Sequence, residues 1–294
     1  MAKQSGRLQK ELVAIRREIR NLREELAWER EQAVLGALIR RGFRCFRRKE
    51  EGGLLLPSAR NSQERFYKLL KKYSFRLFLR DVIGHKVSFS LRDLQRFCSE
   101  ETAGNYLHLL LREKLVKHTS TGGYRLSDER VVSFGDTLEW LVCAILRREF
   151  HLSAAWGFRV EDNLGGGDFD VVALMEGSLV YVETKSSPPK HIHQHEIGAF
   201  FDRLATLRPG LAIFLDDTQL RMKDKIAVMF ERELRQRHGA AWRRKYPLKR
   251  LERETFGIQD RLFIINSDPD LVANIGYCLS RYLQSGGIWL AEGA

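Results

Sequence analysis

The stretch at residues 165–188, GGGDFDVVALMEGSLVYVETKSSP, decides how the centre of this chain folds. It contains two short apolar runs, residues 168–173 and 179–185, and residues 175–178 between them are typical of a tight turn. The pattern therefore predicts two neighbouring strands joined by a hairpin. Both runs are apolar on both faces, which favours a buried sheet over the alternative, a surface hairpin with solvated charges.

Charged side chains interrupt these apolar strands at a few positions. Because side chains alternate between the two faces of a strand, Asp168 and Asp170 share one face of the first run, and Glu183 and Lys185 share one face of the second. Burying carboxylates is costly unless a cation lies between them. A divalent metal ion is the natural candidate.

The acid at Asp170, followed by Glu183-Thr184-Lys185, resembles the signature of the PD-(D/E)xK, or restriction-endonuclease-like, nuclease superfamily. Such families often carry a glutamate on the helix ahead of the strands, and Glu139 matches that position. The resemblance covers about residues 133–220. The residue before the acid is Phe169 where the signature has proline, and no Gln-x-x-x-Tyr follows the lysine, so a RecB-like subgroup is not indicated.

The resemblance implies an enzyme that hydrolyses phosphodiester bonds with Mg²⁺ (or Mn²⁺). Asp170, Glu183 and Glu139 would hold the ion, which prefers carboxylate oxygens, and Lys185 would orient the attacking water or balance the developing charge. Asp168 is a rival of Asp170 for the metal. For Glu139 the alternative is a buried acid that pairs with Lys185.

The segment after the lysine is polar and then returns to alternating helices and strands. His191, His193 and His195 have an alternation that could suit zinc, but no cysteine pair lies nearby, so we expect a polar helix entrance near the site. Further apolar strands are predicted at residues 211–215 and 261–266, and helices at 197–207, 220–237 and 268–283. This alternation predicts a mixed α/β sheet covered by helices on both faces.

The N-terminal segment has a heptad repeat of apolar residues, namely Leu8, Leu12, Ile15, Ile19, Leu22 and Leu26. Glutamates occupy the g positions and arginines the e positions that follow: Glu11, Glu18, Glu25, Arg16, Arg23 and Arg30. In a parallel two-stranded coil each glutamate would face the partner's arginine, so the pattern predicts a homodimer. The alternative is an amphipathic helix folded back on its own domain.

The middle of the chain, residues 64–130, looks like a winged helix-turn-helix. Ser90 and Asp93 resemble a capping box ahead of a helix at 91–98, and Ser99 resembles the cap of a helix at 100–114. Two short strands are predicted at the end of this region, at residues 115–118 and 124–126.

Similar domains often bind duplex DNA through the second helix, which here would present Asn105, Tyr106 and Arg112. Glu100 and Glu101 at its start would repel phosphates, and a protein-contact module is the alternative role.

The charge of the chain favours polyanionic partners, because the formal net charge is +12. Residues 40–49 carry six basic residues and no acid, and clustered cations of this kind neutralise phosphates. We expect nucleic-acid contacts there from Arg40, Arg41, Arg44, Arg47 and Arg48. A second basic cluster, residues 243–250, is equally consistent with a solvated helix face.

The remaining composition points to a protein of a reducing compartment, and we expect it in the cytoplasm. The four cysteines are far apart and show no metal-ligand spacing. The chain opens without a signal-peptide pattern, and no apolar run approaches membrane length.

Together these features predict an α/β protein with a restriction-endonuclease-like core, a mixed sheet flanked by helices, preceded by a coiled-coil helix and a winged-helix domain. The expected parts are residues 1–50, a linker at 51–63, the winged-helix-like domain at 64–130 and the nuclease-like domain at 131–294. The expected function is a dimeric, metal-dependent nuclease, with DNA preferred over RNA. The alternative is a catalytically inactive dimeric DNA-binding or scaffold protein on a nuclease fold.

Overall fold

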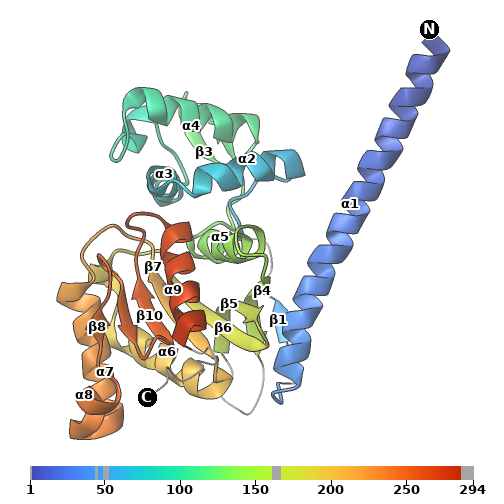
Figure 1. The fold of residues 1–294 in the computed structure, drawn as a ribbon. Helices are drawn as coiled ribbons and strands as arrows, with labels where there is room; N and C mark the ends of the chain where they lie inside the picture. The colour runs from blue at the N-terminus through green and yellow to red at the C-terminus, as the bar shows by residue number, and fades with distance from the viewer. Residues whose placement is uncertain (1, 44–45, 49–52, 161–166, 286–294) are drawn as a thin grey trace.

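The computed structural model describes residues 2–43, 46–48, 53–160 and 167–285, and it confirms a mixed α/β architecture (Figure 1). Within these residues the large sheet has eight strands in the order β1-β4-β5-β6-β7-β10-β9-β8. Their bounds are β1 Phe46–Arg48, β4 Ser153–Val160, β5 Gly167–Met175, β6 Ser178–Lys185, β7 Leu211–Asp216, β8 Lys249–Arg250, β9 Phe256–Ile258 and β10 Leu262–Ile265.

The centre of the sheet changes from antiparallel to parallel pairing at β6. Strands β4, β5 and β6 pair antiparallel, whereas β6, β7 and β10 pair parallel. Parallel neighbours need a crossover, and α6, Gln194–Leu207, supplies it between β6 and β7. The carboxyl ends of β6 and β7 therefore meet at one edge of the sheet.

The predicted hairpin is present. Strands β5 and β6 are joined at Glu176 and Gly177, whose φ angles are 48° and 77°. Two successive residues with positive φ form a two-residue turn whose twist matches that of the flanking strands. Glycine adopts this conformation without a steric penalty. The register places Val171 opposite Val182, so the two strands align over their apolar stretches.

Helices cover both faces of the sheet. On one face α5, Gly135–Arg148, and α9, Leu271–Ser285, pack against a buried cluster that includes Val171 and Val182. On the other face α6 and α7, Val228–His238, enclose a second cluster around Tyr181 and Phe200. A π-helical turn, Lys223–Ala227, precedes α7, short 3₁₀ turns span Pro189–His191 and Gly239–Ala241, and α8 covers Trp242–Lys245.

The middle region consists of helices followed by a small antiparallel sheet: α2 Arg60–Leu70, α3 Tyr73–Gly84, a 3₁₀ helix Leu91–Leu94, α4 Glu100–Arg112, β2 Val116–His118 and β3 Tyr124–Leu126. The capping box of Ser90 and Asp93 is present, and the Ser99 side chain accepts a hydrogen bond from the Thr102 backbone as the cap of α4. The stretch predicted as a linker, residues 51–63, contains ordered structure. Leu55 is buried, and helix α2 already begins at Arg60.

The helix predicted over residues 91–98 is shorter than expected. It ends at Leu94, and residues 95–98 are outside any helix before Ser99, with an extended backbone, caps α4. A continued helix would also have buried little, since Phe97 is exposed.

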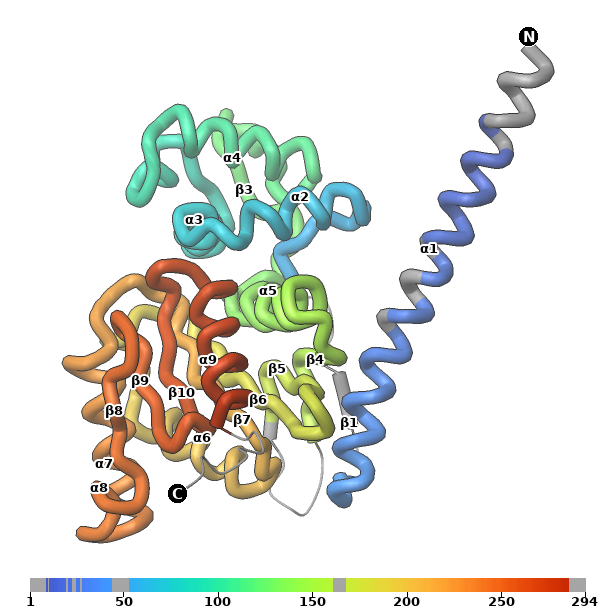
Figure 2. The backbone as a smooth tube through the Cα atoms, in the orientation of Figure 1, coloured from blue at the N-terminus to red at the C-terminus, as the bar shows by residue number. Residues whose placement is uncertain are grey.

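The N-terminal helix, α1, runs from Ala2 to Ile39 and changes character along its length (Figures 1 and 2). The seam residues with described side chains, from Leu12 to Leu26, are between 43% and 58% exposed, whereas Val34, Ala37 and Leu38 are buried. The buried end packs against β4 and β5. Among the described helices, none combines the length and the apolar character needed to cross a membrane.

Candidate active site

Three of the predicted site residues lie together at one edge of the sheet. Asp170 is on β5, and Glu183 and Lys185 are on β6. Glu183 and Lys185 lie on the face covered by α6, and Asp170 is bonded to Thr184, the residue between them. Asp170 is 8% exposed and Glu183 is 1% exposed, whereas the Lys185 side chain retains 17% exposure. The two acids are therefore buried, and the lysine reaches toward the surface.

Glu183 is held by three donors from three positions. The Tyr181 hydroxyl donates to Glu183 Oε2, while Lys185 Nζ and Arg203 Nη2 lie 3.0 and 3.1 Å from Glu183 Oε1. Tyr181 precedes Glu183 by two residues and shares its face of β6, and Arg203 comes from α6. Burial, together with the charge of Glu183, raises the pKa of Tyr181 well above its usual range, so its hydroxyl remains a donor.

Asp170 is fixed by the neighbouring strand. The Thr184 backbone N–H donates to Asp170 Oδ2 at 2.7 Å, and the Thr184 hydroxyl donates to the same oxygen at 3.2 Å. The register of β4 and β5 places Gly157, with φ of 65°, opposite Asp170. A residue with a Cβ would be strained in that left-handed conformation, so the glycine lets β4 depart from extended geometry beside the acid.

Lys185 also connects the site to the start of α6. Its Nζ lies 3.2 Å from Glu196 Oε1, and Glu196 in turn accepts the His193 backbone N–H in a capping box. Burial alone would lower the pKa of Lys185, but Glu183 and the other acids around it outweigh burial and raise the pKa. The ammonium is therefore charged at neutral pH.

Next to Lys185 lies a second pair of buried acids at the end of β7. Asp216 is the register partner of Lys185, and Asp217 follows it. Both are 0% exposed. Sequence reasoning did not include them, nor Tyr181, Arg203 and Glu196. Period-2 spacing predicts that Tyr181 lies on the same face of the strand as Glu183. The His193-x-x-Glu196 capping pattern predicts that Glu196 lies at the start of a helix. The strand pairing that places Asp216 has no local signal.

The other predicted carboxylates are placed differently. Glu139 is 5% exposed on α5, the helix that covers the face opposite to the one on which Lys185 lies. Asp168 forms an ion pair with Arg159 at 2.9 Å and is partly exposed, so Asp170 is the more buried of the two rivals.

The predicted nucleic-acid residues are spread over two surfaces. Arg40 and Arg41 are exposed at the end of α1, Arg44 lies outside the described residues, and of Arg47 and Arg48 only the backbone is described, in β1. On α4, Asn105 is exposed and Arg112 pairs with Glu113 at 3.0 Å. Tyr106 is half-buried, with its ring 4.7 Å from Phe75 and 5.3 Å from Phe78 between centroids.

No protein-family model matches the chain, and no curated protein sequence matches it significantly. Two of the solved structures that resemble it share 15% identity with it. Can2 from Sulfobacillus thermosulfidooxidans, in complex with cyclic tetra-adenylate, matches with a TM-score of 0.46 over 81% of this chain and 57% of that one. Protein VC1899 from Vibrio cholerae matches with a TM-score of 0.47 over 82% and 59%. This chain thus spans less than two thirds of either structure.

The histidines after Lys185 form part of the helix entrance. The rings of His193 and His195 stack with centroids 5.7 Å apart, and His193 is the cap of α6. Over the described part of the chain, no three histidine, cysteine, aspartate or glutamate side chains are grouped so that they could hold a metal ion.

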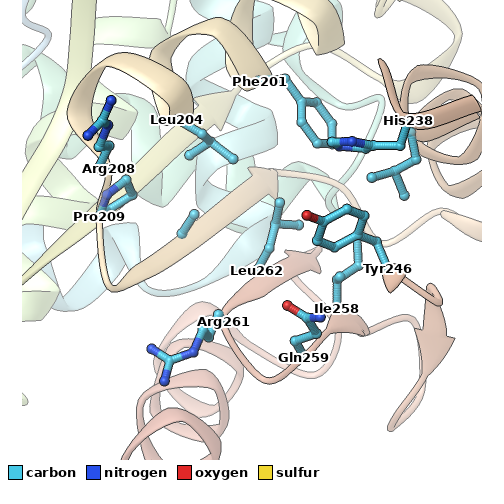
Figure 3. A pocket seen from close by; sticks show the side chains of 12 residues that line it. Phe201, Leu204, Arg208, Pro209, His238, Tyr246, Ile258, Gln259, Arg261 and Leu262 are labelled. Atoms are coloured by element: carbon cyan, nitrogen blue, oxygen red, sulfur yellow. The ribbon is translucent and has the colours of Figure 1, made fainter. Parts of the chain in front are cut away.

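A separate cavity of about 280 Å³ lies at the opposite end of β7 (Figure 3). Phe201, His238 and Tyr246 gather at one end of it, and Arg208 and Pro209 lie at the other. Its walls come from α6, α7, β7 and the β9–β10 turn. The cavity touches Ala212 at the start of β7, whereas the candidate active site adjoins the end of that strand, so the two are distinct.

Proposed function

We propose that this protein is a metal-dependent nuclease of the restriction-endonuclease-like type, which hydrolyses phosphodiester bonds of nucleic acid, with DNA preferred over RNA. One observation carries the proposal: Asp170 lies on the strand next to Glu183 and Lys185, at the same end of the hairpin, and is bonded to Thr184 between them. This is the arrangement that the resemblance implies for a metal-binding pair of acids with its lysine.

The donor set fits a hard divalent ion. Asp170 and Glu183 supply carboxylate oxygens, which Mg²⁺ and Mn²⁺ prefer, and both are buried in a position where carboxylates are costly without a cation. Here Lys185 and Arg203 provide that positive charge to Glu183. Ion binding at Asp170 and Glu183 would therefore require at least Lys185 to move away from Glu183.

The charges of the site suit the hydrolysis of a phosphodiester bond. A divalent ion, when bound, lowers the pKa of water and stabilises negative charge on the phosphate. Lys185, charged and partly exposed, is placed to contact a phosphate oxygen or to position the attacking water. Glu196 and Arg203 hold the lysine and the glutamate in place at the start and middle of α6.

The rest of the chain is proposed to bring nucleic acid to this site as a dimer. The exposed seam of α1 suits a parallel coiled coil with a second copy, because each glutamate at g would meet an arginine at e. The helices and two-stranded sheet of the middle region support a winged-helix-like role in DNA binding, with Asn105 as an exposed polar contact on α4.

A cleavage assay tests the proposal. Linear and circular duplex DNA, single strands, branched junctions and RNA are each incubated with the full chain and Mg²⁺, Mn²⁺ or EDTA. We expect metal-dependent cutting of DNA that is lost in Glu183→Gln and in Lys185→Ala. Glu233→Gln is a matched control, because Glu233 is also a buried carboxylate but pairs with Arg237 on α7. Cutting that survives both site variants would reject the assignment.

A second function, a dimeric DNA-binding or scaffold protein that does not cut, is favoured by one specific feature. Both oxygens of Glu183 are already occupied by Tyr181, Lys185 and Arg203, so the acid is satisfied without a metal. Under this alternative the chain binds DNA with equal affinity in EDTA and in Mg²⁺, and it never cuts. The same assay, followed by gel shift, separates the two functions.

A further inference from the structure

Asp216 is a buried carboxyl group that the proposed chemistry does not use. It is 0% exposed at the end of β7, and neither of its carboxyl oxygens has a hydrogen-bond partner among the described residues. A buried carboxyl group without a donor costs free energy, so a position of this kind calls for an explanation.

The neighbouring residue shows that this end of β7 is otherwise well satisfied. Asp217 accepts hydrogen bonds from Arg76 at 2.8 and 2.9 Å, from Arg80 and from the Ser267 hydroxyl. Burial would raise the pKa of Asp217, but the two arginines outweigh it and lower the pKa. Asp216 lacks such donors although it is one residue away.

Two basic side chains act on Asp216, Arg80 and Lys185, and Lys185 is the one on the adjacent strand that can supply the missing donor. It is the register partner of Asp216 on the adjacent parallel strand, and such strands are about 4.8 Å apart with paired side chains on the same face. Its ammonium contacts Glu183 and Glu196 in this structure, and its charge also acts on Asp216. A small rotation of the lysine side chain would exchange one acceptor for another.

We propose that Asp216 is a positioning residue, the second acceptor of the Lys185 ammonium, which moves from Glu183 to Asp216 when a divalent ion binds at Asp170 and Glu183. This inference rests on the proposed metal-dependent function. It explains how one lysine can neutralise Glu183 in the absence of metal and yet leave the acid available to an ion. It also explains why Asp216 is buried without a donor.

When the Lys185 ammonium moves from Glu183 to Asp216, the protonation state of Asp216 should change. The charged and titratable groups that act on Asp216 are Asp217, Arg80, Lys185 and Glu196, and burial followed by Asp217 raises its pKa to about 8. The carboxyl therefore holds a proton at neutral pH. When the ammonium moves next to it, the ionised form is favoured and the proton leaves to solvent.

The test is calorimetric titration of the full chain with Mn²⁺ or Mg²⁺ alone at pH 7, in two buffers that differ in ionisation enthalpy. We expect Asp216→Asn to weaken ion affinity roughly ten- to hundredfold, because the displaced ammonium keeps Glu196 but gains no second carboxylate in place of Glu183. We also expect this variant to lose the release of about one proton that accompanies binding in the wild type. Glu233→Gln, which removes a buried carboxylate elsewhere, should bind the ion like the wild type.

A double-mutant cycle shows whether the effect passes through the lysine. In a Lys185→Ala background there is no ammonium to move, so adding Asp216→Asn should leave ion affinity unchanged. Equal affinity and equal proton release in the wild type and Asp216→Asn would overturn the inference. A wild type that binds no ion would instead overturn the proposed function, so the two failures are distinguishable.

Discussion

At the scale of single residues, the candidate site is held together by hydrogen bonds to buried carboxylates. Tyr181, Thr184 and Arg203 donate to Glu183 or Asp170 from positions within the hairpin or across the face of the sheet. Hydrogen bonds to charged groups contribute more than neutral ones, about 1.5–3 kcal/mol each. The geometry of the acids is therefore also a source of stability, and this can be measured without a substrate.

Tyr181→Phe should lower the free energy of unfolding by about 1.5–3 kcal/mol, because it removes the hydroxyl donor from a fully buried carboxylate. The midpoint of urea unfolding measures the loss. Tyr282→Phe is the matched control, since the Tyr282 hydroxyl forms a hydrogen bond with the neutral hydroxyl of Ser178 at 3.1 Å in a half-buried setting. Equal losses in the two variants would mean that the charge of Glu183 contributes nothing.

Asp216 should make stability depend on pH. Its pKa is raised from 3.8 to about 8 in the folded chain, so between pH 4 and 8 the folded state holds a proton that the unfolded state releases. The stability associated with this proton is present below pH 4 and is lost as the pH rises through 8. Asp216→Asn cannot ionise, so its melting temperature relative to the wild type should rise from pH 5 to pH 9.

Melting curves at each pH unit measure this difference. Asp217→Asn provides the contrast, because the pKa of Asp217 is lowered and its carboxylate is ionised throughout the range. Its melting temperature should lie below that of the wild type, and this offset should change less between pH 5 and pH 9 than that of Asp216→Asn, because Asp217 causes only part of the rise in the pKa of Asp216. A constant offset for Asp216→Asn would show that this carboxyl does not titrate there.

At the scale of elements, α1 combines two surfaces with different partners. Its last turns pack Val34, Ala37 and Leu38 on the core, while the described side chains of its heptad seam are exposed. The alternative of a helix folded back on its own domain therefore applies only to the end that contains Val34. The exposed seam is the surface for which a second copy is proposed.

Ile19→Asp should convert the proposed dimer to a monomer, because it places a charge at the centre of the coiled-coil seam. Light scattering measures the mass, and the melting temperature of the core should not change. Val13→Asp is the control, since Val13 is 62% exposed on the same helix but lies outside the seam. If both variants have the wild-type mass, α1 does not mediate dimerisation.

At the scale of the whole molecule, the middle region and the core are joined by charge as well as by apolar packing. Arg76, 0% exposed on α3, reaches Asp217 at the end of β7, one residue from Asp216. Removing one member of a buried ion pair costs about 3–5 kcal/mol. The end of β7 thus depends on the middle region for its structure, although 141 residues separate Arg76 from Asp217.

The net charge of +12 should make nucleic-acid affinity depend on salt. If Arg40 and Arg41 contact phosphates, the double variant Arg40→Gln/Arg41→Gln should make the slope of log affinity against log salt shallower by about two units. Fluorescence anisotropy across a salt series measures the slope. Arg232→Gln/Arg235→Gln removes the same charge from exposed positions on α7. Equal changes in both variants would assign the effect to net charge alone.

The sequence by itself determined the elements whose signals are local. The alternation of residues 168–185 and its turn predicted the β5–β6 hairpin, the caps at Ser90 and Ser99 marked two helix starts, and the heptad repeat predicted one long helix. It also placed Asp170 on the strand next to Glu183 and Lys185, because they lie on consecutive strands of one hairpin, and period-2 geometry put Glu183 and Lys185 on one face.

Only the tertiary structure decided which residues surround that hairpin. Asp216, Glu196 and Arg203 reach the site through a parallel crossover, and Arg76 arrives from another region of the chain. Contacts of this kind depend on strand order and on which helix covers which face of the sheet. Neither produces a periodic pattern in the sequence. Local chemistry thus predicted the acids and the lysine, while long-range pairing supplied the donors that hold them and left Asp216 buried without one.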